Sequence, residues 1–151
     1  MSTYRFYYPI QVRYGDLDPQ WHVNNARFFT FIEAARFAYY IHLGLFDGKS
    51  FHDLETIIAD VRVSYLASIL LGQNIRVGVR ISRLGNKSMD LEAQIEDQDS
   101  GKVLATCKAV TVAYDYRAGK SKPISDHWRQ VISAFEGISP GPDPAPGSAS
   151  K

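Results

Sequence analysis

Residues 25–43 read NARFFTFIEAARFAYYIHL. The stretch is rich in alanine and aromatic residues, and Gly44 follows it as a C-terminal stop, so it predicts a helix. At about 100° per residue, one face of this helix carries Phe28, Phe31, Ile32, Ala35, Tyr39 and Leu43. The other face carries Ala34, Phe37, Ala38 and Ile41. Because such a helix is apolar nearly all round, we expect other elements to enclose it.

Four segments after this helix alternate between apolar and polar residues or are rich in β-branched residues, as half-buried strands are. They are TIIADVRVSYL (56–66), NIRVGVRISRL (74–84), SMDLEAQIED (88–97) and KVLATCKAVTVAYDY (102–116). Turn residues separate them. The outward charges of the second segment are arginines and those of the third are aspartate and glutamate, which indicates a hairpin with cross-strand ion pairs.

Two further elements complete the pattern. Residues 5–14 are expected to form a strand that is irregular or lies at a sheet edge, because Pro9 cannot donate a hydrogen bond. Residues 125–137 predict a second helix with Ser125 or Asp126 as its cap and Gly137 as its stop. This order predicts an α+β fold in which a strongly curved antiparallel sheet wraps around the long central helix. One sheet covers only part of such a helix, so we expect a second subunit.

The composition narrows the class of protein. The chain has 151 residues, 45% hydrophobic and 22% charged, which is ordinary for one soluble globular domain. We place that domain at residues 1–137 and expect the Pro/Gly/Ser-rich residues 138–151 to be disordered.

A net charge of +1 argues against nucleic acid as a partner. The single cysteine, Cys107, excludes an intramolecular disulfide and a cysteine cluster for zinc. No apolar run has the character of a signal peptide or a transmembrane helix, so we expect a cytoplasmic protein without a membrane contact.

The residues that lead into the long helix are unusually polar. The stretch RYGDLDPQWHVNN (13–25) contains Asp16, Asp18, His22, Asn24 and Asn25. Capping a helix start needs only one short polar side chain. Taken alone, Asp18-Pro19 is a common turn opener, but the surplus of polar groups predicts a functional site.

Residues 13–36, RYGDLDPQWHVNNARFFTFIEAAR, resemble the signature of the hotdog-fold acyl-CoA thioesterases, in the 4-hydroxybenzoyl-CoA thioesterase-like group. That signature is roughly Asp-x-Asp-x-x-Gly-His-Val-Asn-Asn-x-x-Tyr followed by Phe-Glu-x-x-Arg. The matching positions are Asp16, Asp18, His22, Val23, Asn24, Asn25, Phe28, Glu33 and Arg36. Later segments, VSYLASILLGQNIRV (63–77) and RLGNKSMDLE (83–92), also resemble the family in the right order. The chain departs at Trp21, where the family has glycine, and at Ala67 or Ser68, where it has proline.

The resemblance implies a hotdog fold and thioester hydrolysis without a metal or cofactor. The family's catalytic carboxylate maps onto Asp18, as a nucleophile or as a general base for water. The family's oxyanion donor is a backbone N–H at the start of the helix, near Asn25, where the helix dipole also favours negative charge. His22 is expected either to orient Asp18 or the acyl carbonyl, or only to pack. Asp16 is expected to bond the local backbone.

Glu33 lies two turns into the helix, where a second hotdog clade carries its catalytic carboxylate. In the clade resembled here, we expect an ion pair with Arg36, or a supporting contact behind the site. The walls of the acyl pocket are expected to include Trp21 and Phe28, with simple packing as the alternative for Trp21.

Coenzyme A carries phosphates, so cations should surround its site. The turn SRLGNKS (82–88) offers Arg83, Lys87 and Ser88, and the resemblance places the nucleotide at this turn through Lys87. Solvated turn residues are the alternative. The expected partner is an acyl-CoA substrate, with an acyl-carrier-protein thioester as the alternative, in a homodimer or homotetramer.

Two other functions compete with thioester hydrolysis. A non-catalytic acyl-CoA-binding hotdog protein would usually carry a DNA-binding module, for which we see no basic segment. Hotdog enoyl-CoA hydratases use Asp-x-Asn-Pro-x-His. The stretch DLDPQWH (16–22) has Asp18 in place of the asparagine and one extra residue before His22.

Overall fold

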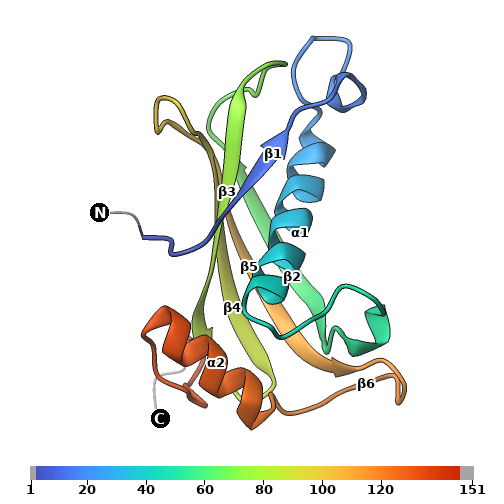
Figure 1. The fold of residues 1–151 in the computed structure, drawn as a ribbon, viewed down its shortest axis with the longest axis vertical. Helices are drawn as coiled ribbons and strands as arrows, with labels where there is room; N and C mark the ends of the chain where they lie inside the picture. Colours follow the sequence, from blue (N-terminus) through green and yellow to red (C-terminus); the bar gives the residue numbers. More distant parts are fainter. Residues whose placement is uncertain (1–2, 147–151) are drawn as a thin grey trace.

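The computed structural model describes residues 3–146 of the chain (Figure 1). Its elements are β1 (Tyr7–Gln11), the 3-10 turn η1 (Tyr14–Asp16), α1 (Asn25–His42), the 3-10 turn η2 (Phe51–Asp53), β2 (Thr56–Tyr65), β3 (Asn74–Leu84), β4 (Ser88–Asp97), β5 (Val103–Asp115), β6 (Lys120–Ser121) and α2 (Asp126–Glu136). The predicted long helix, the four strands after it and the second helix each begin and end within one residue of the expected positions.

The strands form one antiparallel sheet in the order β1-β3-β4-β5-β2, and the short β6 pairs with β5. The sheet curves around α1, which lies along one of its faces (Figure 1). This arrangement confirms the predicted α+β hotdog fold. The strand that follows α1 in sequence, β2, lies at the far edge of the sheet, and among the described strands it pairs with β5 alone.

The predicted hairpin of β3 and β4 is confirmed, and its outer face is a row of ion pairs. Arginines of β3 meet carboxylates of β4 at directly opposed positions of the ladder. The pairs are Arg76–Glu96, Arg80–Glu92 and Arg83–Asp90.

The sheet covers one side of α1 only. Phe28, Phe31, Ile32, Ala35 and Tyr39, all from the predicted apolar face, are buried against the strands. On other sides of α1, Phe29 is 36% exposed and Ile41 is 47% exposed. The expected enclosure of the helix is therefore incomplete within one chain, because a single sheet cannot reach around it. Among residues 3–146, no helix has the length and apolar character needed to cross a membrane.

The first strand is shorter than the predicted range 5–14. The chain leaves the sheet after Gln11 and turns through η1, where the backbone N–H of Arg13 donates to the Asp16 carboxylate at 2.8 Å. As expected from Pro9, β1 is an edge strand, and within residues 3–146 its one partner is β3.

Residues 138–146 make hydrogen bonds with the domain, and the expected disorder of the tail from residue 138 onward stays a prediction. The backbone N–H of Asp143 donates to the carbonyl of Leu84 at 2.8 Å, and the Arg83 guanidinium donates to the carbonyl of Asp143 at 2.9 Å. Arg129 of α2 donates to the carbonyl of Pro140 at 2.9 Å. Since composition does not reveal such contacts, the sequence could not predict them. Residues 147–151 of the expected tail lie outside the described residues.

Candidate active site

The loop between η1 and α1 is a tight, internally bonded turn. Leu17 and Val23 form an antiparallel bridge across it. Inside the bridge, the N–H of Asp18 donates to the carbonyl of His22 at 2.9 Å, and the N–H of Trp21 donates to the carbonyl of Asp18 at 3.0 Å. Trp21 has a φ of 65°, a left-handed conformation that favours glycine. The position at which the resemblance has glycine is therefore one whose backbone glycine adopts most easily, and this chain carries a bulky residue there.

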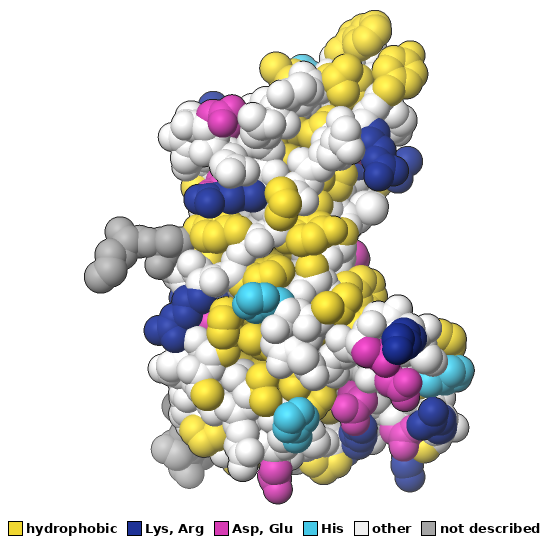
Figure 2. Space-filling model, viewed as in Figure 1, with side chains coloured by type: hydrophobic (Ala, Val, Ile, Leu, Met, Phe, Trp, Pro, Cys, Tyr) yellow, Lys and Arg dark blue, Asp and Glu magenta, His cyan; other side chains and the backbone are white. Residues whose placement is uncertain are grey.

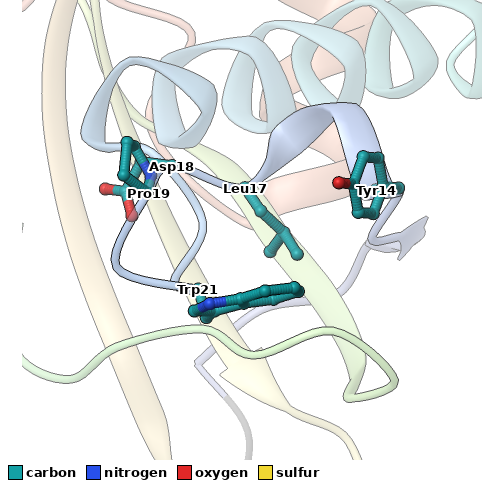
Figure 3. Close-up of a pocket in the computed structure, with 5 residues that line it drawn as sticks. All are labelled: Tyr14, Leu17, Asp18, Pro19 and Trp21. Carbon is teal, nitrogen blue, oxygen red and sulfur yellow. The ribbon is translucent and has the colours of Figure 1, made fainter.

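Asp18 lies half-buried on this loop beside a cavity of about 350 Å³. Figure 3 shows the residues that line the cavity: Tyr14, Leu17, Asp18, Pro19 and Trp21. The Leu17 side chain points toward the indole ring of Trp21, which is 68% exposed. One carboxylate oxygen of Asp18, Oδ1, accepts a hydrogen bond from the N–H of Gln20 at 2.9 Å. Its other oxygen bonds to none of the described residues, so it is available to a substrate or a water molecule.

The start of α1 leaves one backbone donor available. Asn24 is the N-cap, and its side chain accepts a hydrogen bond from the N–H of Ala26 at 2.9 Å. The carbonyl of Asn24 accepts a hydrogen bond from the N–H of Arg27 at 2.8 Å. Within residues 3–146, the N–H of Asn25 donates to no group. The predicted oxyanion donor is therefore an uncapped N–H at the positive end of an 18-residue helix.

Two residues from the end of β2 and the segment after it contact this site, and the sequence did not predict either as a site residue. The Tyr65 hydroxyl donates to the backbone carbonyl of Asn25 at 3.1 Å, and its ring packs edge-on against Phe28 with centroids 4.9 Å apart. Ser68 Oγ lies 3.5 Å from His22 Nδ1. Both residues lie in the segment that resembles the family, but the alternation of β2 gave Tyr65 the appearance of an ordinary strand residue.

The position of His22 is fixed mainly by backbone hydrogen bonds rather than by contacts of its side chain. It forms an isolated bridge with Leu70, and the next residue, Val23, donates its N–H to the carbonyl of Ile69 at 2.9 Å. Among the described residues, its ring contacts Ser68 and not the Asp18 carboxylate. An orienting role of His22 toward Asp18 or toward the acyl carbonyl stays a prediction.

Asp16 has the structural role that the sequence predicted. Its carboxylate accepts the hydrogen bond from the N–H of Arg13 and lies 3.5 Å from Nε of Arg27. Its backbone carbonyl accepts a hydrogen bond from the N–H of Asn24 at 2.8 Å. Asp16 therefore ties η1 to the cap of α1.

Glu33 forms the predicted ion pair with Arg36. The two carboxylate oxygens accept hydrogen bonds from Nε and Nη2 of Arg36 at 3.2 and 2.8 Å. The Arg36 side chain is 5% exposed and that of Glu33 is 43% exposed. At about 1.5 Å of rise per residue, Glu33 lies roughly 12 Å along the helix from Asn25. One chain therefore does not bring Glu33 into the same cluster as Asp18.

The predicted coenzyme A turn lies at the opposite end of the sheet from Asp18. The active-site loop contacts Ile69 and Leu70, just before β3 begins, whereas Arg83, Lys87 and Ser88 lie where β3 ends. At about 3.3 Å per residue, the 11 residues of β3 put roughly 33 Å between these ends.

The Arg83 guanidinium already makes hydrogen bonds to other side chains of the same chain. It makes a two-pronged contact with Asp90 at 2.8 and 3.0 Å and donates to Ser88 Oγ at 3.4 Å. Lys87 is exposed. Of the predicted substrate-binding residues, Trp21 lines the cavity beside Asp18. Phe28 is buried in the core and is not among the residues that line this cavity. Arg83, Lys87 and Ser88 lie together at the β3–β4 turn. In the part of the chain that is described, no three His, Cys, Asp or Glu side chains are grouped as a metal site requires.

Known proteins resemble the chain in sequence and in structure. The family model described as the Thioesterase-like superfamily matches residues 12–132. The long-chain acyl-CoA thioesterase FadM of Escherichia coli is 26% identical over 123 residues, which cover 82% of this chain and 93% of FadM. A thioesterase from Thermus thermophilus, solved with coenzyme A and zinc, is 33% identical with a TM-score of 0.80, covering 91% of this chain and 99% of that one. A predicted thioesterase from Bacillus stearothermophilus is 27% identical with a TM-score of 0.79, covering 90% and 98%. Since the family model spans most of the sequence, the chain belongs to the Thioesterase-like superfamily.

Proposed function

We propose that this protein hydrolyses acyl-CoA thioesters, with Asp18 as its catalytic carboxylate. One observation carries the proposal: Asp18 offers a carboxylate oxygen without a protein partner among the described residues, beside a cavity and a few residues before a helix whose first N–H is uncapped. Thioester hydrolysis needs this pair of groups, a carboxylate and a donor for the carbonyl oxygen. The names of FadM and of the coenzyme A-bound Thermus protein support the same substrate class.

Two routes are compatible with this arrangement. In the first, an Asp18 oxygen attacks the thioester carbon, the C–S bond breaks, the coenzyme A thiolate leaves, and water then hydrolyses the acyl-aspartate anhydride. In the second, Asp18 takes a proton from a water molecule as the water oxygen attacks the same carbon. Negative charge develops on the carbonyl oxygen in both routes, and the N–H of Asn25 and the helix dipole stabilise it.

We further propose that the working unit contains at least two copies of the chain. The outer edge of β2 has no partner strand in the described sheet, and apolar side chains are exposed along it and just after it. These are Ile57, Val61, Tyr65, Leu66, Leu70 and Leu71. Hydrophobic atoms also extend over the upper end and the middle of the face in Figure 2. A surface of this kind is typical of an interface.

A second copy would also explain the separation of the two predicted halves of the site. In one chain, Asp18 and the turn with Lys87 lie at opposite ends of β3. If β2 of a second copy pairs antiparallel with β2 of the first, the Lys87 turn of the second copy lies toward Asp18 of the first. Coenzyme A would then contact both subunits. A homodimer or homotetramer is the expected state. A monomer in analytical ultracentrifugation at micromolar concentration would contradict a shared site.

The deciding experiment is a thiol-release assay with DTNB. Short, medium, long and aromatic acyl-CoAs are offered to the protein, and acylated carrier protein is tested in parallel. Release of free coenzyme A from at least one substrate supports hydrolysis, and the ratio of rates separates coenzyme A from the carrier protein. Binding without release from any substrate favours the non-catalytic acyl-CoA-binding protein. Addition of water to crotonyl-CoA, followed as loss of the enoyl absorbance, favours the hydratase.

A further inference from the structure

The edge strand β2 carries two exposed charges of opposite sign that have no partner in their own chain. Asp60 and Arg62 lie on either side of Val61. Their side chains line one hollow, together with Lys108 of β5, on the face of the sheet that carries the ion pairs of β3 and β4. Within residues 3–146, neither side chain forms an ion pair or a hydrogen bond. Both charges are therefore available to a partner at the free edge of the sheet.

The sheet gives Arg62 an unfavourable neighbour. Arg62 is directly opposite Lys108 in the pairing of β2 with β5. On the next strand, Glu92 is opposite Lys108, but Glu92 already forms an ion pair with Arg80 of β3. Directly opposed like charges destabilise a pair of strands. This row of charges therefore ends at the free edge with an excess of positive charge, and a carboxylate beyond β2 would balance it.

We propose that β2 of a second copy pairs antiparallel with β2 of the first about a two-fold axis at Val61. In such a pair, the residue one place before the axis lies opposite the residue one place after it, and the two side chains point to the same face. Asp60 of each copy then forms an ion pair with Arg62 of the other. The inference rests on the proposed assembly through β2 and adds its register.

The charges disfavour the neighbouring registers. An axis at Asp60 places two carboxylates opposite each other, and an axis at Arg62 does the same to two guanidinium groups. An axis between two residues pairs an outward side chain with an inward one, so the second α1 lies on the other face of the sheet. The exposed Phe29 and Ile41 of α1 then have no second helix beside them. Only an axis at Val61 gives both charges a directly opposed partner.

The other face of β2 supplies an apolar contact at the same axis. Val61 is opposite Ala109, a core residue, yet its own side chain is 37% exposed. About the proposed axis, the two Val61 side chains lie directly opposite each other. Burial of apolar surface contributes affinity, whereas complementary charges mainly select the register.

This register brings the predicted coenzyme A turn of one copy to the active-site loop of the other. The N–H of Ala113 donates to the carbonyl of Lys87 at 2.8 Å, and Ala113 pairs with Thr56 at the start of β2. About the proposed axis, the start of β2 in one copy lies opposite its end in the other. At that end, Tyr65 donates to the carbonyl of Asn25. The two halves of the proposed thioesterase site therefore meet across the joined strands.

The first experiment is disulfide cross-linking of the full chain under mild oxidation. Val61→Cys should form an intermolecular disulfide, because directly opposed residues of an antiparallel pair have Cα atoms about 4.5–5.5 Å apart, a separation that a disulfide spans. Val63→Cys is the matched control. Its two copies would be offset along the strands by roughly 13 Å at about 3.3 Å per residue, so it should not cross-link. The native Cys107 is buried and should not react. Faster cross-linking of Val63→Cys than of Val61→Cys would overturn the register.

The second experiment measures the dissociation constant of the dimer by sedimentation equilibrium. Arg62→Asp places aspartates opposite each other across the axis, and we expect Kd to rise by roughly 10-fold or more. Within one chain the same change replaces a like-charged pair with an opposite-charged one beside Lys108, so the fold should be kept. Adding Asp60→Arg to Arg62→Asp restores both ion pairs and should return Kd to the wild-type value.

Lys102→Glu is the control for net charge, since it makes the same change of charge at an exposed residue between β4 and β5. It should leave Kd unchanged. Equal effects of Arg62→Asp and Lys102→Glu, or no rescue by Asp60→Arg, would contradict the proposed ion pairs.

These outcomes can be told apart from a failure of the proposed function. A wild-type protein that releases coenzyme A but is monomeric, or that does not cross-link through Val61→Cys, contradicts the register and leaves hydrolysis standing. Cross-linking through Val61→Cys in a protein that releases thiol from no acyl-CoA supports the register and contradicts the proposed function.

Discussion

The hydroxyl of Tyr65, the last residue of β2, donates a hydrogen bond to the backbone carbonyl of Asn25, the first residue of α1, at 3.1 Å. The edge strand of the sheet therefore holds the residue whose N–H is the proposed oxyanion donor. The Tyr65 ring also packs on Phe28, one turn further along the helix.

Tyr65→Phe should lower kcat with little change in KM. The variant keeps the ring contact with Phe28 and loses only the hydrogen bond to Asn25. A net hydrogen bond contributes about 0.5–1.5 kcal/mol, so a loss of roughly 2- to 10-fold in kcat is expected. Steady-state kinetics with the best acyl-CoA measures it. Tyr8→Phe on β1 is the control and should match the wild type; an unchanged kcat in Tyr65→Phe would mean that this contact does not position Asn25.

Asp18→Asn should reduce kcat by at least roughly 100-fold, the usual size of a positioned acid–base contribution, with KM little changed. The amide keeps the shape of the side chain and removes the charge that attacks or activates water. Glu33→Gln should cause a smaller loss, because Glu33 pairs with Arg36 and lies two turns away from Asn25. The reverse order, with Glu33→Gln inactive and Asp18→Asn nearly normal, would assign the reaction to the helix carboxylate.

Asp16→Asn should affect stability more than turnover. The carboxylate accepts a hydrogen bond from Arg13 and lies near Arg27, and removing its charge weakens both contacts. We expect the free energy of unfolding to fall by about 1 kcal/mol, as for other local hydrogen bonds, in urea titrations at neutral pH. A larger loss of kcat than in Asp18→Asn would show that Asp16 takes part in the chemistry.

Glu136→Gln should make the protein more stable at neutral pH. Burial raises the pKa of Glu136 above its ordinary value of 4.5, although Tyr39 donates to its carboxylate at 2.7 Å. A raised pKa means that the folded state binds the proton more tightly than the unfolded state does. The contribution of Glu136 to the free energy of unfolding is therefore fully present below pH 4.5, and it is lost as the pH rises through the folded-state pKa.

Glutamine cannot ionise and still offers an oxygen to Tyr39. The advantage of the variant should therefore grow between acidic and neutral pH in urea titrations. A constant difference between Glu136→Gln and the wild type would contradict the raised pKa.

The thiol of Cys107 should not react with DTNB in the folded protein. Burial, with a smaller effect from the charge of Glu33, raises its pKa to about 11, so the thiolate is scarce at neutral pH. One thiol per chain should appear in urea, measured by the same absorbance as the activity assay. Fast labelling of the native protein would show that the core around β5 opens readily.

The sequence by itself determined where the helices and strands lie in the chain and which helix the sheet buries. Hydrophobic periodicity is a local property, so the apolar positions of residues 25–42 and the alternation in residues 74–84 could be read directly. Local chemistry also predicted the Asp16 contact with the backbone and the ion pair of Glu33 with Arg36, since each joins residues that are close in the chain. The motif around Asp18 was recognisable for the same reason.

Only the tertiary structure decided which distant residues meet. Alternation does not specify strand order, so the position of β2 beside β5, at the free edge of the sheet, could not be predicted from it. That position brings Tyr65 to Asn25 and Ser68 to His22. Within one chain, the sheet also separates Lys87 from Asp18 by the length of β3. These relationships depend on pairing between segments far apart in the chain, which is set by how the whole sheet curves to bury α1.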